Sequence, residues 1–366
     1  MLGLIGAAIG TTWELPFEIP YILWLQGIAG KGSFLYYLMN FLSMFGEELI
    51  LVGVMGLIYW GLDKKRGENI GMFLLATTLL TPMIKNVACR TRPFDAHEQV
   101  QNLRDVDGYS FPSGHSSGSA SVFFGTAVAY KDKKRKWLWI VCSIIPVLVA
   151  VSRNYLGAHY PTDVIAGLAL GVGVVFLMNW LVRVVHNKYY IYGGILLVGA
   201  AGFFYCTTSD FFTAYGIAIG FMCGMLFEEK LVNFKNTKVW WRIVLRVVVG
   251  GALFLLLNTG LKKIVGCFGD KVLVNGEYVY WFDDGNHFWF TSIFRVIRYA
   301  LIVFLLLGVY PALFAQTEKL WKKFGWIKTE TDTPLEAQPA SETEVVTTAT
   351  VACEVEVTEQ KDDTSV

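Results

Sequence analysis

Charged residues are scarce in this chain of 366 residues. Asp, Glu, Lys and Arg together supply 17% of the sequence, whereas an ordinary soluble domain contains about 25%. The charges also nearly cancel, which leaves a formal net charge of +1. Because there is neither a basic surplus nor a basic stretch interleaved with aromatic residues, the sequence argues against a nucleic-acid partner.

Paired cysteines are missing as well. The six cysteines are scattered, mostly through apolar segments, and none belongs to a Cys-x-x-Cys pair. Such cysteines usually behave as small hydrophobic side chains, so we expect neither a zinc site nor a disulfide framework. The N-terminal stretch MLGLIGAAIGTTWELP lacks a basic start and an obvious cleavage site, so we expect no cleaved signal peptide.

What the chain has in excess is apolar sequence. Hydrophobic residues make up 54% of it, and its mean hydropathy is +0.46. A membrane-spanning helix needs about 20 mostly apolar residues. Nine segments approach that requirement: 46–62, 68–88, 113–130, 137–151, 164–182, 189–206, 211–227, 243–261 and 288–315. We therefore expect an all-α integral membrane protein, a helical bundle with about nine transmembrane helices.

Positive charges recur after every second expected span. The basic segments are 63–68, 131–136, 183–188, 228–242 and 319–328. Because cytoplasmic loops are enriched in Lys and Arg, we expect these ends to be cytoplasmic. The opposite loops are then extracytoplasmic: 85–112, 152–163, 207–210 and 262–287.

The regions at the two ends of the chain differ from the expected spans. Residues 1–45 are apolar and aromatic but interrupted by Gly and charge, so we expect interfacial helices or one irregular span. Residues 46–186 form the expected catalytic core, and 187–316 supply additional transmembrane helices. Residues 317–366 become rich in Glu, Thr and Val, so we expect a disordered acidic cytoplasmic tail there.

Ionisable side chains on the expected outer side indicate a functional site, because charge near membrane depth is costly. Lys85 lies near the end of an expected helix. Arg92 is followed by Pro93, which stops a helix, so the two cations can converge from one helix end. Arg153 adds a third cation, whose planar fork suits phosphate oxygens.

The same side holds a helix start and two histidines. Ser113 and Gly114 lie where a helix begins, so free N–H groups and the helix dipole favour an anion there. His159 and Asp163 are four residues apart, on one face if that segment is helical. The carboxylate can then hold one imidazole nitrogen and leave the other free to attack. With His115 beside them, these groups predict phosphoryl transfer without a metal.

The residues also follow a three-part pattern. Lys85 to Pro93 reads K-x6-R-P, Pro112 to His115 reads P-S-G-H, and Ser152 to Asp163 reads S-R-x5-H-x3-D. All eleven specified positions resemble the signature of the type-2 phosphatidic acid phosphatase superfamily, and they look like its bacterial lipid-phosphatase branch. The resemblance covers about residues 46–183. It implies the helical bundle shared with vanadium haloperoxidases and glucose-6-phosphatase.

The resemblance implies a role for each matching residue. His159 is the expected nucleophile, which forms a phosphohistidine, and Asp163 orients it. His115 is the expected general acid for the leaving alcohol. We expect the phosphate to be held, with no metal or other cofactor, by Lys85, Arg92, Ser113, Gly114 and Arg153.

The expected function is a metal-independent phosphomonoesterase or diphosphatase that acts on a membrane lipid. We expect it in a bacterial cell membrane, with its active site on the extracytoplasmic side. Phosphatidic acid, phosphatidylglycerol phosphate, undecaprenyl diphosphate and sphingoid-base phosphates all stay open as substrates, as does the oligomeric state.

The alternative is a lipid flippase or transporter that uses the same charges. Such proteins usually show internal repeats and broken helices that meet in the middle of the bilayer. We find no repeat between 46–183 and 189–315, and the charges gather at one face. The sequence therefore favours the enzyme. Arg90 and Arg104 receive no role from these patterns.

Overall fold

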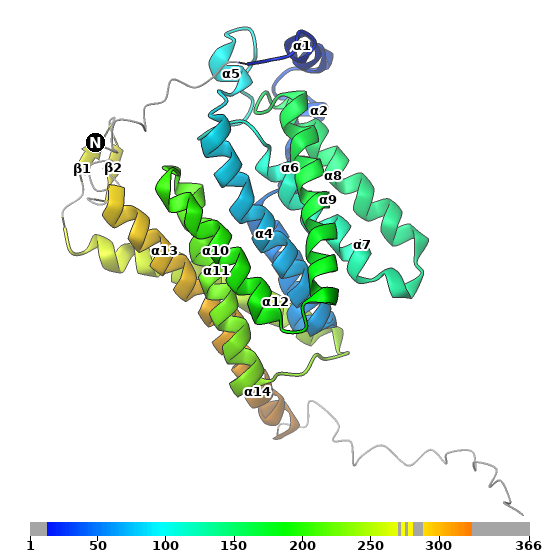
Figure 1. Cartoon of the computed structure of the whole chain (residues 1–366), viewed down its shortest axis with the longest axis vertical. Coiled ribbons are helices and arrows are strands. Elements are labelled where there is room, and N and C mark those ends of the chain that lie inside the picture. The colour runs from blue at the N-terminus through cyan, green and yellow to red at the C-terminus, as the bar shows by residue number, and fades with distance from the viewer. Residues whose placement is uncertain (1–12, 270–271, 275–276, 281–287, 324–366) are drawn as a thin grey trace, which may run out of the picture. The chain divides into compact units, whose positions relative to one another are not determined.

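The computed structural model describes residues 13–269, 272–274, 277–280 and 288–323 (Figure 1). The chain divides into two units, residues 1–316 and residues 317–366. Most of the expected acidic tail, 324–366, lies outside the described residues.

Six helices in the described part are long and apolar enough to cross a membrane. They are Lys64–Ala88 (α4), Lys136–Tyr155 (α8), Pro161–Val184 (α9), Ser209–Val232 (α11, Ser209–Phe227, with one further turn), Trp240–Gly266 (α12) and Phe288–Thr317 (which begins with α13, Phe288–Phe304). A seventh span results if the bent pair α2 (Phe34–Met44) and α3 (Glu48–Gly56, prolonged to Leu62) is counted as one. The expected all-helical membrane fold is thus confirmed with six or seven candidate spans.

These six or seven candidate spans are fewer than the expected nine. The expected span 113–130 is a shorter continuous helix, made of α6 (Gly114–Ser119), a π-helical turn and α7 (Gly125–Ala129). The expected span 189–206 is Lys188–Phe204, which includes α10 (Lys188–Ala200). The residues 113–121 include five serines, so the first turns of that helix serve polar contacts rather than an apolar surface.

The remaining described elements are short. They are α1 (Glu18–Ile28), α5 (Pro93–Ala96), a 3-10 turn (Lys131–Lys133), α14 (Ala312–Lys323) and the strands β1 (Val272–Val274) and β2 (Glu277–Val279). The two strands form an antiparallel hairpin in which Leu273 pairs with Tyr278. This hairpin lies in a loop that the sequence pattern left without structure.

Helix α4 lies between the helices of the expected catalytic core and the additional helices (Figure 1). It contacts α6 and α9 on one side and α10 and α11 on the other. The apolar core follows the same path, because one buried cluster includes side chains from α4, α9, α10, α11 and α13. Helix α4, whose last turn carries Lys85 of the first motif, therefore lies at the junction between the expected core and the additional helices.

Two glycines of α9 bring that helix very close to α6. A Cβ atom on Gly167 would lie 2.6 Å from the carbonyl oxygen of Ser113, and one on Gly171 would lie 2.4 Å from that of Ser117. Real Cβ atoms do not approach an oxygen so closely, so only glycine allows this packing. As a result the start of α6 lies against the start of α9, and the Ser113 N–H donates to the carbonyl oxygen of Asp163 at 3.0 Å.

Candidate active site

The three sequence motifs meet at one end of the helices α4, α6, α8 and α9. Arg92 Nη1 of the first motif lies 3.4 Å from His159 Nε2 of the third. The second motif joins the third through the backbone bond from Ser113 to Asp163. Lys85 lies in the last turn of α4 and is buried there. Residues that are far apart in sequence therefore form one buried polar cluster.

His159 has different neighbours at its two ring nitrogens. Nδ1 lies 3.5 Å from Asp163 Oδ2 and 3.4 Å from the Ser110 hydroxyl oxygen, which donates to the same carboxylate oxygen at 2.5 Å. Nε2 faces Arg92. A proton on Nδ1, held by these acceptors, leaves the Nε2 lone pair available for attack.

The four-residue spacing of His159 and Asp163 puts both on one face if the segment is helical, but the two residues do not share a helical turn. His159 precedes α9, which begins at Pro161, and Asp163 lies in its first turn. The Asp163 carboxylate turns back and accepts the backbone N–H of Tyr160 at 2.9 Å. The carboxylate therefore lies beside the imidazole because it reaches back to the N-cap residue of α9, as the third helical residue does in a capping box.

The loop before His159 depends on one glycine. Gly157 has a φ of +75°, and a Cβ atom there would lie 2.5 Å from the carbonyl oxygen of Gln101. A side chain would be strained in this conformation and would clash with the neighbouring loop. The Asn154 amide nitrogen then donates to the His159 carbonyl oxygen at 2.8 Å, which restrains the His159 backbone.

Electrostatics favour the neutral form of His159. Burial, together with the cations Arg92, Arg153 and Lys85, holds the pKa of the His159 imidazole well below its usual value of 6.5. A neutral imidazole carries the lone pair that a nucleophile needs. The buried site is thus suited to attack on a phosphorus atom at neutral pH.

Two arginines surround the site in different ways. Arg92 donates to the carbonyl oxygens of Gly108, Asp107 and Ala158 at 2.9, 2.6 and 3.0 Å, so the backbone fixes its guanidinium. Arg153 donates from Nη1 to the hydroxyl oxygen of Ser43 at 2.9 Å. Its Nε and Nη2 atoms are buried and have no hydrogen-bond partner among the described residues. Buried donors are costly to leave unpaired, so these two indicate an anion-binding position.

The start of α6 carries the second motif. Ser113 is its N-cap, and the Ser113 hydroxyl oxygen accepts from the Ser116 N–H at 3.4 Å and from the Ser116 hydroxyl at 3.1 Å. Gly114 is the first helical residue, and a Cβ atom there would meet only Thr81 Cγ2, at 3.9 Å. The protein's own packing therefore does not require glycine at 114, and the start of α6 stays open at this position.

His115 is held by an acidic side chain from the N-terminal region. Its Nε2 lies 3.1 Å from Glu47 Oε1, which also accepts from Arg104 Nη2 at 2.5 Å. This contact gives the expected general acid a fixed orientation. Neither Glu47 nor Arg104 was assigned by the sequence patterns.

Sequence reasoning missed several residues that surround the site. Glu18 and Arg90 are fully buried; Arg90 contacts Asp163, and Glu18 contacts Arg90. The Ser43 hydroxyl oxygen accepts from Arg153, and the Ser110 hydroxyl donates to Asp163. A signal existed for Glu18, which stands alone in the apolar stretch PFEIPYILW, and for Arg90, which lies inside the first motif. No group of three or more His, Cys, Asp or Glu residues that could hold a metal occurs in the described part of the chain.

Comparison with known proteins places two parts of the chain in one family. Residues 69–187 match the PAP2 superfamily, and residues 212–323 match the transmembrane extension of PAP2 superfamily phosphatases. The second match assigns helices for which the sequence patterns offered no motif.

Individual relatives agree with the family match. An undecaprenyl-diphosphatase from Sulfolobus acidocaldarius is 37% identical over 145 residues, which are 38% of this chain and 67% of that protein. Phosphatidylglycerophosphatase B from Bacillus subtilis is 33% identical over 145 residues, which are 37% of this chain and 68% of that protein.

A solved structure is also similar. The crystal structure of a transmembrane PAP2-type phosphatidylglycerolphosphate phosphatase from Bacillus subtilis has 25% sequence identity and a TM-score of 0.41, and the match covers 50% of this chain and 93% of that chain. The resemblance found in the three motifs is confirmed by the family matches and the two relatives. The chain therefore belongs to the PAP2 superfamily and is a membrane lipid phosphate phosphatase that carries the family's transmembrane extension.

Proposed function

We propose that the protein removes phosphate from a membrane lipid through a phosphohistidine on His159, without a metal. The observation that carries this proposal is the pair of environments around the imidazole. Asp163 and Ser110 lie at Nδ1, while Arg92 lies at Nε2. Arg153 supplies the buried donors that have no protein partner among the described residues.

The first chemical step forms a P–N bond and breaks a P–O bond. The Nε2 lone pair of His159 attacks the phosphorus atom, and the bonding pair leaves with the lipid oxygen or, for a diphosphate, with the bridging oxygen. His115 donates a proton to that oxygen. Arg92, Arg153 and Lys85 stabilise the charge on the three equatorial oxygens, as metal ions do in other phosphoryl-transfer enzymes.

The second step restores the enzyme. The imidazole side chain of His115, which has lost its proton, accepts one from a water molecule as the water attacks the phosphohistidine. The P–N bond breaks, and inorganic phosphate leaves. Asp163 stabilises the cationic imidazole ring in both steps, because its carboxylate faces Nδ1.

We further propose that the site opens to the extracytoplasmic side of a bacterial cell membrane. The basic loops 63–68, 131–136 and 183–188 follow the opposite ends of the helices, and the positive-inside rule makes those ends cytoplasmic. This topology uses nine crossings, so the shorter helices Gly114–Ala129 and Lys188–Phe204 would also pass through the bilayer.

Four lipid classes are candidate substrates. Undecaprenyl diphosphate and phosphatidylglycerol phosphate are supported by the names of the two relatives, while phosphatidic acid and sphingoid-base phosphates share the same phosphate chemistry. Phosphate release from each lipid by the purified full chain in detergent tests the proposal. We expect release from at least one of the four, and no release from any of them would contradict the function.

Metal chelation gives a second expected result. Because cationic side chains take the place of a metal, phosphate release from the best lipid is expected to be unchanged in excess EDTA. The assay compares initial rates with and without EDTA, and a known magnesium-dependent phosphatase in the same buffer shows that chelation is complete. Loss of activity that added Mg²⁺ restores would contradict the mechanism.

A further inference from the structure

The Asp163 carboxylate is held from two sides. Its Oδ2 atom accepts from Ser110 and from the backbone of Tyr160, and faces His159. Its Oδ1 atom accepts from Arg90 Nη1 at 2.5 Å. The second contact has no part in the mechanism described above, although it is as close to the carboxylate as the contact from Ser110.

Arg90 is held in place by several contacts. Its side chain is fully buried, and its guanidinium lies between the rings of Trp13 and Tyr160, with Cζ at 3.9 and 3.8 Å from the ring centroids. Nη1 also donates to the Thr162 hydroxyl oxygen at 2.7 Å. A planar guanidinium fixed in this way cannot follow Asp163 if the carboxylate turns, so it sets the carboxylate orientation.

The opposite side of Arg90 is occupied by Glu18 of helix α1. Arg90 Nη2 lies 2.7 Å from Glu18 Oε2, and both side chains are fully buried. Glu18 Oε1 accepts from the Thr162 N–H at 3.0 Å and from the Thr162 hydroxyl at 2.5 Å. Helix α1 lies outside the segment that matches the PAP2 superfamily, so the charge comes from a part of the chain beyond the shared motifs.

Glu18 is ionised in this setting. Burial opposes ionisation, but hydrogen bonds from Thr162 and Leu15 and the charge of Arg90 together lower the pKa of the Glu18 carboxyl. The three fully buried groups, Asp163, Arg90 and Glu18, then carry one net negative charge. Without Glu18, the Arg90 guanidinium would cancel the charge of Asp163, and the imidazole would lose the anion that stabilises its cationic form.

We propose that Glu18 and Arg90 are positioning residues that orient Asp163 and keep its negative charge effective toward His159. This inference rests on the proposed function, because it assumes that His159 becomes cationic during phosphoryl transfer. It assigns helix α1 a catalytic influence without contact to the substrate. A purely structural ion pair would stabilise the fold and leave the chemistry of His159 unaffected.

Glu18→Gln tests this inference, since it keeps the side-chain size and removes the charge. We expect kcat for lipid phosphate release to fall about 10–100-fold, the range seen when a partner that orients a metal-binding histidine is removed. KM is expected to stay nearly constant, because the phosphate-binding cations are untouched. Glu14→Gln is the matched control, because Glu14 lies on the same segment and pairs with the partly exposed His97.

The pH profile separates an effect on His159 from lost stability. The charged and titratable groups that act on His159 are Asp163, Arg92, Arg153, Lys85 and His115. All of them remain in the Glu18→Gln protein. Removing a nearby negative charge disfavours the imidazolium, so the acid limb of kcat/KM is expected to move to lower pH. An unmoved acid limb would overturn the inference.

A double-mutant cycle shows whether Glu18 acts through Asp163. Single-turnover release of radiolabelled phosphate is compared for Glu18→Gln in the wild-type and the Asp163→Asn backgrounds. We expect the loss only in the wild-type background, and equal losses in both would overturn the inference. If Glu18→Gln does not fold, Thr162→Val decides, because it removes only the hydroxyl shared by Glu18 and Arg90. A smaller fall in kcat at constant KM supports the inference, and unchanged kcat overturns it.

The same assays distinguish failure of this inference from failure of the proposed function. Wild-type protein that releases no phosphate from any of the four lipids, or a His159→Ala protein that still does, would defeat the proposed function itself. A functional wild type, an inactive His159→Ala protein and an unaffected Glu18→Gln protein would defeat only the role of Glu18.

Discussion

Replacement of His159 by alanine is expected to lower lipid phosphate release by about 10⁴-fold or more, the scale of loss seen when a covalent nucleophile is removed. The imidazole is the group whose Nε2 faces Arg92 while its Nδ1 is held near Asp163. Initial rates of purified wild-type and variant protein, with the best lipid from the panel, measure the effect.

The control for this experiment is His97→Ala. His97 pairs with Glu14 at 2.7 Å and has no part in the proposed mechanism, so its loss is expected to leave the rate unchanged. Matching thermal unfolding in detergent shows that both variants are folded. Turnover by His159→Ala close to the wild-type rate would rule out covalent catalysis at this residue.

Replacement of Arg153 by alanine is expected to produce the second largest loss, about 10²–10³-fold in kcat/KM, as for other donors to a charged transition state. Arg153 is fully buried, and its Nε and Nη2 atoms have no partner among the described residues. Arg153→Lys is expected to rescue only part of the loss, because an ammonium group cannot reproduce the planar fork. Vanadate inhibition is expected to weaken in parallel.

Arg183→Ala provides the matched control, because Arg183 lies in the last turn of α9, at the opposite end of that helix from Asp163. It is expected to change neither kcat/KM nor vanadate inhibition. Full activity of Arg153→Ala would show that the two free donors do not hold the phosphate, and the assignment of the anion position would be wrong.

The sequence identified best those site residues whose spacing within a motif can be recognised without knowledge of the fold. Lys85, Arg92, Arg153 and His159 could be grouped because their spacing alone matches a family pattern. The structure then shows that Arg92 lies next to His159 and that Arg153 is buried. Their individual roles are still predictions.

Contacts between distant segments could not be read from the sequence. Glu18, Ser43 and Glu47 each reach a motif residue or its partner across 68 to 110 positions. No periodicity links such positions, because the contacts depend on how α1, α2 and α3 fold over the ends of other helices. The single acid in an apolar helix was the one available hint.

Helix lengths were predicted less well than helix positions. Residues 113–130 contain a serine-rich start whose hydroxyls bond to the preceding turn, so the apolar composition of the whole segment predicted too long a span.

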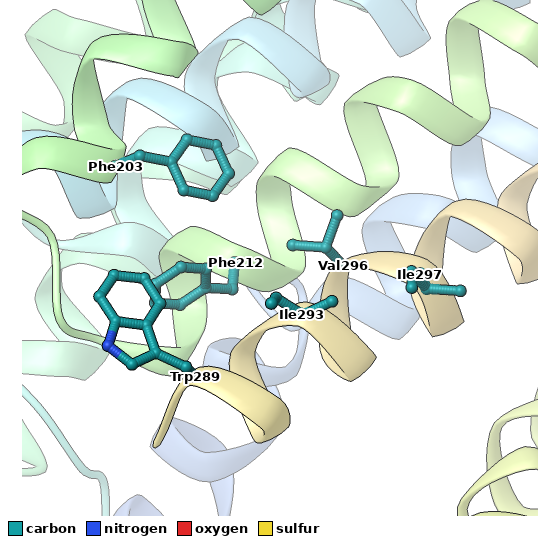
Figure 2. A pocket seen from close by; sticks show the side chains of 6 residues that line it. All are labelled: Phe203, Phe212, Trp289, Ile293, Val296 and Ile297. Carbon is teal, nitrogen blue, oxygen red and sulfur yellow. The ribbon is translucent and has the colours of Figure 1, made fainter. Parts of the chain in front are cut away.

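The packing of the additional helices could not be predicted from sequence patterns either. They pack against α4 through α10 and α11, and they enclose a groove lined only by apolar side chains: Phe203, Phe212, Trp289, Ile293, Val296 and Ile297 (Figure 2).

The most direct measurement of the central claim is trapping of the covalent intermediate. The full chain is mixed with the best lipid substrate carrying ³²P in the transferred phosphate and is quenched within one turnover. We predict protein-bound label that is lost in acid and retained in alkali, as a phosphohistidine behaves, and that maps to the peptide containing His159. Label that is absent while phosphate is released, or that persists in His159→Ala, would contradict the mechanism.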